Sequence, residues 1–240
     1  MSELDPQRIC AVIAAYNEGG RIGGVVRRVR AVLPDVVVVD DGSADATAKE
    51  AEAAGALVLK HAVNSGKGAA MATAFDFARA QGFEAAITLD GDGQHDPADM
   101  ARFLAVYREG EFRVLVGNRM ADTRHMPLVR LLTNRFMSWL LSREMGQRVP
   151  DTQCGFRLYS LDVLAGALPQ DRRFAAESEI LMELSVRGVR IGSVPVATVY
   201  GTEQSKIHPV KDTVRFFGML RRFRKARKDR RGAALPRGLV

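Results

Sequence analysis

Two aspartates and a glutamine stand at alternate positions directly after an apolar run of the sequence. Asp90, Asp92 and Gln94 follow residues 85–89, which have the composition of a buried strand. Side chains two residues apart in an extended chain point to the same side, so these three groups can converge on one hard cation. Mg²⁺ or Mn²⁺ usually takes one or two protein carboxylates and leaves its other positions to water and substrate phosphates. The spacing therefore favours a metal site that binds a nucleoside diphosphate.

Two other interpretations of this acidic cluster are weaker. An isolated Asp-Gly-Asp-Gly sequence is often a solvated turn, but here it directly follows a predicted strand. A calcium-binding EF-hand loop counted from Asp90 would need a glutamate where Ala101 stands and a glycine where His95 stands. The sequence therefore excludes the EF-hand.

Further polar residues follow the other apolar runs. Asp41 ends the second run, where a carboxylate can accept hydrogen bonds from a ribose or a base edge, whereas Asp45 is expected to cap a helix. Residues 64–68 contain Gly-Lys-Gly but lack the earlier glycine and the Ser/Thr of a P-loop. Lys67 can contact a phosphate at a helix start, or it can be a solvated residue beside a tight turn. The first strand is not followed by GxGxxG, which disfavours a dehydrogenase.

Strand and helix patterns alternate along the first half of the chain. We expect strands at residues 9–15, 36–39, 57–59, 85–89 and 114–116, and helices at residues 22–33, 46–54, 68–81, 97–107 and 127 to about 145. This alternation predicts an α/β fold with a mostly parallel sheet flanked by helices, and such sheets bind ligands at the carboxyl ends of their strands. Each polar motif lies after one of the expected strands. We place one domain at residues 1–210 and a basic segment at residues 211–240.

Composition indicates the cellular compartment in which the protein works. The 240 residues include two cysteines and no CxxC pair, which argues against a disulfide framework or a structural zinc site. Residues 1–8 are polar and do not resemble a signal peptide. The longest stretch without a charge, residues 191–202, is shorter than the roughly 20 residues of a membrane span. We therefore expect a cytoplasmic protein without a transmembrane helix.

The basic charge is concentrated at the end of the sequence. Residues 211–240 carry 11 Lys/Arg and two Asp, so this segment alone exceeds the net charge of +7 of the whole chain. Phe216, Phe217, Leu220 and Phe223 recur at helical spacing among arginines. Such a helix can lie in an anionic membrane interface, or it can pack its aromatic side chains on the body of the protein. A basic run also binds nucleic acid without sequence preference, but we expect no specific nucleic-acid partner.

The ordered motifs resemble those of family 2 inverting glycosyltransferases. The resemblance rests on residues 12–18, 39–43, 64–68, 90–95 and 117–119, with later motifs at residues 151–157, 177–180 and 205–207. Within that family, the sequence is most similar to dolichol-phosphate mannosyltransferases and related polyprenyl-phosphate glycosyltransferases, over about residues 9–207. The resemblance implies a Rossmann-like GT-A fold and a nucleotide-sugar-dependent hexosyltransferase. It also implies a polyprenyl-phosphate acceptor. The basic segment would bring the enzyme to such a lipid by peripheral association with the cytoplasmic face of an anionic membrane.

The resemblance also assigns roles to individual residues. The nucleotide-sugar donor would contact Ala14, Tyr16, Glu18, Asp41, Lys67, Asp90 and Gly91. Asp90, Asp92 and Gln94 would bind Mg²⁺ or Mn²⁺, and the catalytic set would be Asp92, Arg119, Arg130 and Asp151. Arg119 and Arg130 would hold the acceptor phosphate. Ala14 stands where the family often has proline, and Asn134 where a phosphate-binding serine occurs.

Two alternatives stay open at this point. One is a family 2 enzyme that transfers the sugar to a saccharide or another hydroxyl acceptor, in which case a carboxylate such as Asp151 would be needed as the general base. The other is a protein without catalytic activity that binds a nucleotide or nucleic acid through its basic tail. The intact Asp-x-Asp motif favours the enzyme.

Overall fold

The structure, a computed structural model, describes residues 8–124, 126–167, 176–197 and 216–225. The chain divides into two compact units, residues 1–203 and 204–240. The later motif at residues 205–207 and most of the basic segment lie outside the described residues.

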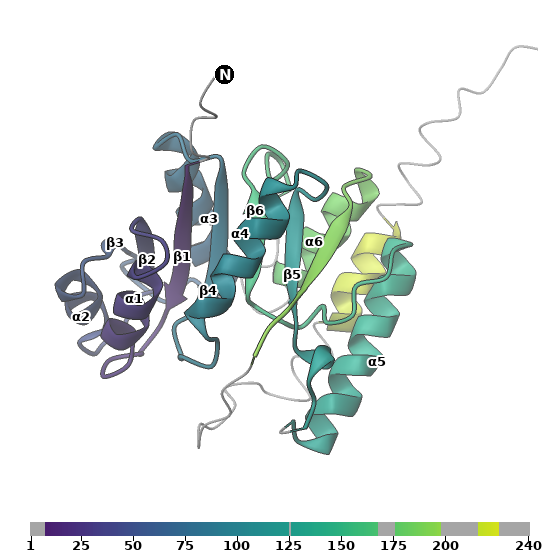
Figure 1. Ribbon diagram of the computed structural model, residues 1–240, viewed down its shortest axis with the longest axis horizontal. Helices are drawn as coiled ribbons and strands as arrows, with labels where there is room; N and C mark the ends of the chain where they lie inside the picture. The colour runs from purple at the N-terminus through teal and green to yellow at the C-terminus, as the bar shows by residue number, and fades with distance from the viewer. Residues whose placement is uncertain (1–7, 125, 168–175, 198–215, 226–240) are drawn as a thin grey trace, which may run out of the picture. The chain divides into compact units, whose positions relative to one another are not determined.

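Strands and helices alternate through the first unit (Figure 1). The strands are β1 (Ile9–Ala15), β2 (Val36–Asp40), β3 (Leu57–Lys60), β4 (Ala85–Asp90), β5 (Val114–Asn118), β6 (Arg157–Ser160) and β7 (Ile191–Pro195). The α-helices are α1 (Ile22–Arg30), α2 (Thr47–Ala53), α3 (Lys67–Ala80), α4 (Met100–Arg108), α5 (Leu128–Met145) and α6 (Ala176–Val186). Short 3₁₀ turns, η1 (Pro97–Asp99) and η2 (Arg119–Ala121), precede α4 and follow β5. The five expected strands and five expected helices are thus confirmed, with small shifts at their ends.

The shifts at the helix ends have local causes. The first helix was expected to reach Leu33 but ends at Arg30, because the ring of Pro34 disfavours helical backbone at the residue before it. The helix expected from Pro97 begins as a 3₁₀ turn instead. The side chain of Asp96 accepts the N–H of Ala98 at 3.1 Å and holds this tighter turn.

Seven strands form one sheet in the order β3-β2-β1-β4-β6-β5-β7. All pairs are parallel except those of β6, which runs antiparallel to both β4 and β5. The strands at the centre are almost wholly buried, as their continuous apolar runs predict for a sheet with both faces covered. Figure 1 shows α4 in front of the sheet and α3 and α6 behind it.

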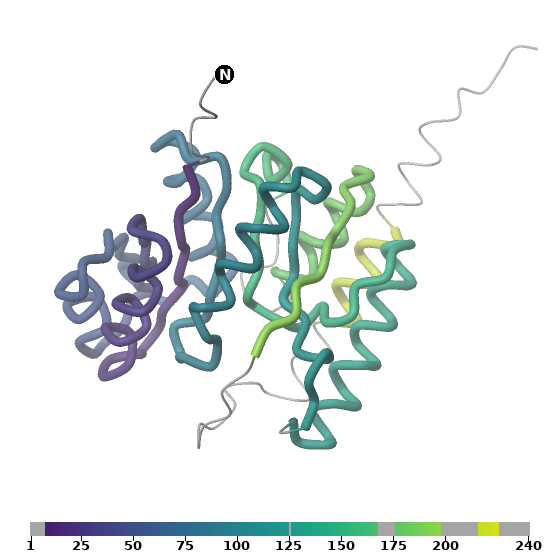
Figure 2. The backbone as a smooth tube through the Cα atoms, viewed as in Figure 1, coloured from purple at the N-terminus to yellow at the C-terminus, as the bar shows by residue number. Residues whose placement is uncertain are grey.

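The carboxyl ends of the parallel strands gather at one edge of the sheet. Ala14 of β1 is in register with Asp90 of β4, and Ala15 is in register with Asp40 of β2. Figure 2 shows the chain leaving β1, β4, β5 and β7 at this same edge, the lower one in the view. The loops that carry the sequence motifs are therefore neighbours, although they are far apart in the chain.

In the second unit, residues 216–225 form a helix. Phe216, Met219 and Leu220 are buried and lie on one face of it, while Phe217 is half exposed. The helical spacing of the apolar residues is thus confirmed for the described part of the basic segment. Within the described residues, no helix is both long and apolar enough to cross a membrane.

Candidate active site

A cluster of charged side chains surrounds the end of β4. Lys67, the first residue of α3, donates from Nζ to Oδ1 of Asp90 at 2.5 Å and to Oε2 of Glu177 at 3.0 Å. Burial disfavours the charged forms of both Lys67 and Asp90, but the ion pairs stabilise these charged forms by more. They hold the pKa of Asp90 well below its usual range and raise the pKa of Lys67 above its ordinary value. Lys67 is therefore not a solvated surface lysine, and it ties together the starts of α3 and α6 and the end of β4.

His95 closes the other side of Asp90. Its Nε2 lies 3.7 Å from Oδ2 of Asp90, and its ring packs against Phe156 with centroids 5.3 Å apart. The side chain is buried, and among the described residues its Nδ1 has no hydrogen-bond partner. A buried imidazole nitrogen without a partner is unusual, and it leaves Nδ1 of His95 available to a further polar group.

The loop after Asp90 carries the remaining candidate metal ligands. Asp92 accepts the backbone N–H of Gln94 at Oδ1 over 2.9 Å, which makes a tight turn. In the part of the chain that the structure describes, no three His, Cys, Asp or Glu side chains are already gathered around one metal position. Asp90, Asp92 and Gln94 nevertheless offer two carboxylates and an amide oxygen. This donor set fits Mg²⁺ or Mn²⁺ that completes its coordination with water and phosphate oxygens.

Asp41 organises the loop between β3 and α3. Its buried carboxylate accepts the backbone N–H groups of Ser65 at 2.9 Å and Gly66 at 2.7 Å, and it contacts Nδ1 of His61 at 2.7 Å. Gly42 allows this loop to come close, because a Cβ there would lie 2.6 Å from the backbone carbon of Val63. Oδ1 of Asp41 already has two partners, which leaves Oδ2 better placed for an additional ligand.

The loops after β1 and β2 are tied together by hydrogen bonds. Asn17, which has a left-handed φ of 53°, donates its N–H to Ser43 Oγ at 2.9 Å and accepts from Ala44 N–H at its own Oδ1. Next to it, Glu18 donates its N–H to Thr47 Oγ1 at 2.8 Å. Asp45 accepts the N–H of Thr47 at 2.9 Å, but the N-cap position of α2 is Ala46, so Asp45 closes the turn before the helix and is not the helix cap expected from the sequence. The two loops thus form one rigid rim.

The remaining donor-side candidates lie along this rim. Ala14 is in β1 beside Asp90, Tyr16 is 41% exposed, and Glu18 is buried. A Cβ on Gly91 would lie 3.5 Å from Cγ of Glu18 and 3.4 Å from Ile22, which is ordinary van der Waals contact, so the acidic loop lies next to Glu18. The structure therefore brings together the residues that the sequence assigns to the donor.

Arg119 and Asp151 form a buried ion pair after β5. Nε of Arg119 donates to Oδ2 of Asp151 at 2.7 Å, and Nη2 donates to Oδ1 at 3.0 Å. Asp151 also accepts the backbone N–H groups of Arg119 and Gln153, each at 3.2 Å. The Asp151 side chain is fully buried, and both of its oxygens are used. It is suited to orient the guanidinium of Arg119 and not to accept a proton from a substrate hydroxyl.

The loop at residues 151–156 packs directly against Asp90 of the acidic cluster. A Cβ on Gly155 would lie only 2.6 Å from Oδ2 of Asp90, so a glycine is needed for this approach. Arg157 holds the loop in place with its buried guanidinium, which donates to the carbonyls of Thr152, Cys154 and Glu177 at 2.7–2.8 Å. Burial opposes its charge, but Tyr159 and Glu177 raise the pKa of Arg157 above its ordinary value.

Helix α5 borders the same loop. Arg130, Asn134 and Ser138 are spaced by one turn and therefore share a face of the helix. Ser138 Oγ accepts the N–H of Thr152 at 2.9 Å, which fixes this face against the loop. Asn134 is buried, and its Nδ2 has no hydrogen-bond partner among the described residues. A free amide donor and an arginine therefore lie one turn apart beside the loop.

Sequence reasoning did not assign roles to Glu177, His95, Gly155 or Arg157. All four lie in segments that the family resemblance marks, but no local pattern says that Glu177 pairs with Lys67, 110 residues away. Arg157 stands next to an apolar run, but a charged residue in that position is usually exposed, so the sequence did not predict that Arg157 is buried.

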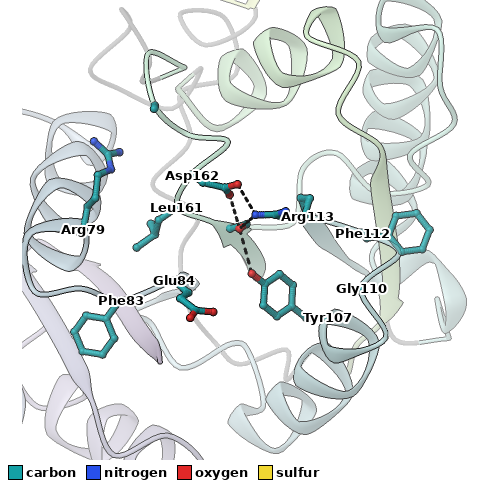
Figure 3. A pocket seen from close by; sticks show the side chains of 11 residues that line it. Arg79, Phe83, Glu84, Tyr107, Gly110, Phe112, Arg113, Leu161 and Asp162 are labelled. Carbon is teal, nitrogen blue, oxygen red and sulfur yellow. Dashed lines mark hydrogen bonds and ion pairs between the residues drawn. The ribbon is translucent and has the colours of Figure 1, made fainter. Parts of the chain in front are cut away.

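A separate hollow of about 540 Å³ lies at the opposite edge of the sheet (Figure 3). It lies near the amino ends of β4 and β5 and the end of β6, and Glu84, Arg113 and Asp162 are among its lining residues. Arg113 donates to Ser160 Oγ at 2.9 Å and pairs with Asp162. None of the motif residues lines it, so it is distinct from the candidate site.

Comparison with known proteins identifies the family. The profile of Glycosyl transferase family 2 matches residues 10–166. A UDP-N-acetylglucosamine–dolichyl-phosphate N-acetylglucosaminyltransferase of Methanococcus voltae is 32% identical, and the match covers 82% of this chain and 87% of the relative. An undecaprenyl-phosphate mannosyltransferase of Micrococcus luteus is 28% identical over 80% of this chain and 84% of the relative. Glucosyl-3-phosphoglycerate synthase from Mycobacterium tuberculosis, crystallised with Mn²⁺, uridine diphosphate and phosphoglyceric acid, matches with a TM-score of 0.70 at 18% identity, over 92% of this chain and 78% of that chain. The chain therefore belongs to glycosyl transferase family 2, and it is a glycosyltransferase with the GT-A fold.

Proposed function

We propose that this glycosyltransferase moves a sugar from a nucleoside-diphosphate donor to a polyprenyl phosphate. The observation that carries the proposal is the contact of Gly155 with Asp90, because it joins two different binding regions. On one side are the acidic residues suited to a metal and a diphosphate. On the other are the buried Arg119–Asp151 pair and the polar face of α5, which are suited to a second anion.

The donor would occupy the rim formed by the loops after β1, β2 and β4. Asp41 and Glu18 would face the nucleoside, and Asp90, Asp92 and Gln94 would hold Mg²⁺ or Mn²⁺, with Asp92 as the ligand on which catalysis depends. When bound, the metal supplies positive charge that stabilises the departing diphosphate. Lys67 holds a second positive charge beside Asp90 at 2.5 Å. These charges act where negative charge develops as the bond breaks.

The proposed reaction is a single displacement that inverts the anomeric centre. An oxygen of the acceptor phosphate forms a bond to the anomeric carbon, while the bond from that carbon to the diphosphate oxygen breaks. The electron pair of the broken bond leaves with the nucleoside diphosphate. Arg119, oriented by Asp151, and Arg130 would hold the acceptor phosphate in line with the bond that breaks.

The state of Asp151 favours a phosphate acceptor over a hydroxyl acceptor. A hydroxyl must lose a proton as it attacks, and Asp151, the carboxylate considered for that role, is buried and hydrogen-bonded through both oxygens. A phosphate monoester has a second pKa of about 6, so it already carries its charge near neutral pH and needs no strong base. The names of the relatives from Methanococcus voltae and Micrococcus luteus, both lipid-phosphate transferases, support the same choice.

A lipid acceptor would require the enzyme to work at a membrane. We propose that it associates peripherally with the cytoplasmic face of an anionic membrane and that the basic segment at residues 211–240, treated as a separate domain, contributes to this attraction.

Sugar transfer from radiolabelled donors tests the function directly. UDP-N-acetylglucosamine, UDP-glucose and GDP-mannose are each incubated with a polyprenyl phosphate and Mn²⁺ or Mg²⁺, with a chelator as the control. The proposal expects metal-dependent label in the lipid fraction from one of these donors. Metal-dependent hydrolysis of a donor without labelled lipid would instead move the acceptor to a saccharide or another hydroxyl.

Two variants separate the active site from the rest of the protein. Asp92→Ala should abolish transfer, whereas Glu109→Ala, which removes an exposed acid at the end of α4, should leave it unchanged. Equal activity of the two variants would contradict the role of the acidic cluster.

A further inference from the structure

Helix α5 exposes large apolar side chains on its outer face. The side that packs against the protein carries the three buried residues of the helix, Asn134, Ser138 and Leu141. The side that faces outward carries Leu128, Val129, Leu132, Phe136 and Trp139, each between 52% and 78% exposed. A helix on the surface of a water-soluble protein normally does the opposite, with its apolar stripe toward the core. The outer face is therefore not explained by the folding of this unit.

These five side chains form a continuous stripe. At 100° per residue they fall within about one third of a turn of each other, because they recur at intervals of three, four and seven residues. They are half of the ten large apolar side chains exposed in the described residues. Contiguous apolar patches of this kind usually mark a contact with another molecule or a membrane.

The charged side chains beside the apolar stripe indicate which kind of surface it binds. Arg135 and Arg143 are exposed beside the stripe, and Cζ of Arg143 lies 5.9 Å from the ring of Trp139. The one acidic residue of α5, Glu144, is not among its exposed residues. Aliphatic side chains, an indole ring and arginines together match the boundary between acyl chains and anionic headgroups. An acidic lipid surface satisfies both the charge and the apolar area.

We propose that the outer face of α5, formed by Leu128, Val129, Leu132, Arg135, Phe136, Trp139 and Arg143, is a surface that docks on an anionic lipid bilayer. The inference rests on the proposed function and adds a location to it. The opposite face of α5 carries Arg130 and Asn134, and a helix with its side chains is only about 10–12 Å across. Docking through α5 therefore brings the candidate phosphate-binding groups close to the depth of lipid headgroups, where the phosphate of a membrane-embedded polyprenyl phosphate lies.

Trp139 reports on this docking without any label, because it is the only tryptophan of the chain. The full-length protein is mixed with vesicles of phosphatidylcholine and phosphatidylglycerol, and separately with pure phosphatidylcholine. We expect Trp139 emission to shift to shorter wavelength with the anionic vesicles and to be quenched when the lipids carry bromine on their acyl chains. Emission and quenching that stay unchanged while the protein co-sediments with the vesicles would show that it binds by another surface, and would overturn the proposal.

A matched pair of variants tests the apolar stripe and keeps the reporter. Leu132→Gln combined with Phe136→Gln should lower the affinity for anionic vesicles about tenfold or more, because both side chains would lose the apolar surface that the bilayer buries. Leu57→Gln removes an exposed leucine on β3 and should change binding less than twofold. Equal binding by both variants would refute the role of α5. A concentration-dependent dimer that shifts Trp139 emission without vesicles would do the same and would assign the face to a second copy.

A soluble acceptor separates failure of this inference from failure of the proposed function. With a short-chain isoprenyl phosphate in solution, the double variant should transfer sugar at the wild-type rate, and with polyprenyl phosphate in vesicles it should lose activity in proportion to binding. Loss with both acceptors would mean that α5 supports the site itself and not the membrane contact. No transfer by the wild-type protein to either acceptor would contradict the proposed function, while the fluorescence result would still decide the docking surface.

Discussion

Adding one methyl group at Gly155 should weaken donor binding more than it weakens the fold. The new Cβ would lie 2.6 Å from Oδ2 and 3.2 Å from Cγ of Asp90, whereas ordinary contact begins near 3.4 Å. Either the loop or the carboxylate must therefore move by about 0.8 Å. Overpacking of this kind costs about 1–3 kcal/mol. Because about a third of the Asp90 side chain is exposed, it can swing aside, and most of the cost should fall on the metal site.

Calorimetric titration with Mn²⁺ and with UDP or GDP measures this effect. For Gly155→Ala, we expect affinity for the metal–nucleotide pair to fall about 5-fold to 150-fold, which corresponds to the same 1–3 kcal/mol. The melting temperature should fall by only a few degrees. Gly24→Ala is the matched control, since a Cβ there meets nothing within 4 Å and the residue lies within α1. If Gly155→Ala bound the nucleotide as tightly as Gly24→Ala does, the contact between the loop and Asp90 would not shape the donor site.

Three further predictions follow from the same geometry. Asp92→Ala should abolish Mn²⁺-dependent nucleotide binding, and calorimetry showing unchanged affinity would refute the metal assignment. Asp151→Asn leaves the buried guanidinium of Arg119 without its counter-charge, so urea denaturation should show a loss of about 3–5 kcal/mol, and a loss below about 1 kcal/mol would contradict the buried pair. Burial raises the pKa of the Cys10 thiol to about 12, so the unfolded chain releases this proton near pH 9 while the folded chain keeps it. Stability from this thiol is therefore complete below about pH 8 and falls as the pH rises from about 9 to 12, by about 1.4 kcal/mol per unit, and Cys10→Ala should remove this part of the alkaline loss.

The first five strands could be predicted because each is an apolar run bounded by polar or turn-forming residues. β6 could not be predicted, since it begins with a charged residue, Arg157, and ends with a serine. Arg157 is nevertheless buried, because its guanidinium meets three carbonyl oxygens that only the tertiary fold brings together. β7 contains Gly192 and ends at Pro195, residues that are infrequent in strands, and it occupies the edge of the sheet where they are tolerated.

In the candidate site, too, local sequence patterns predict some residues but not the tertiary contacts that those residues make. The residues after β1, β2 and β4 could be grouped from sequence, because parallel strands place their carboxyl ends at one edge. The partners of those residues could not be identified. Glu177 shares Lys67 with Asp90, and Asp151 is committed to Arg119, and both arrangements depend on segments that meet only when the sheet is complete. Spacing along the sequence identifies the candidate side chains. Long-range packing determines which of those side chains are already hydrogen-bonded to other residues and which can still bind a ligand.

The reversed direction of β6 brings a loop from the second half of the chain to the edge where the donor loops gather. A parallel strand would bring the loop that follows it to the working edge, but β6 brings the loop that precedes it, so residues 151–156 enter the site between two anchored elements, α5 and β6. The residues assigned to the donor are encoded before Arg119, and the groups assigned to the acceptor are encoded from Arg119 onward. Glu177 and Gly155 belong to the later stretch, but they lie against the donor-side residues Lys67 and Asp90. Substitutions in the later stretch can therefore alter the acceptor region and, through Gly155 and Glu177, the nucleotide site as well, so the two specificities are coupled at Asp90 and Lys67.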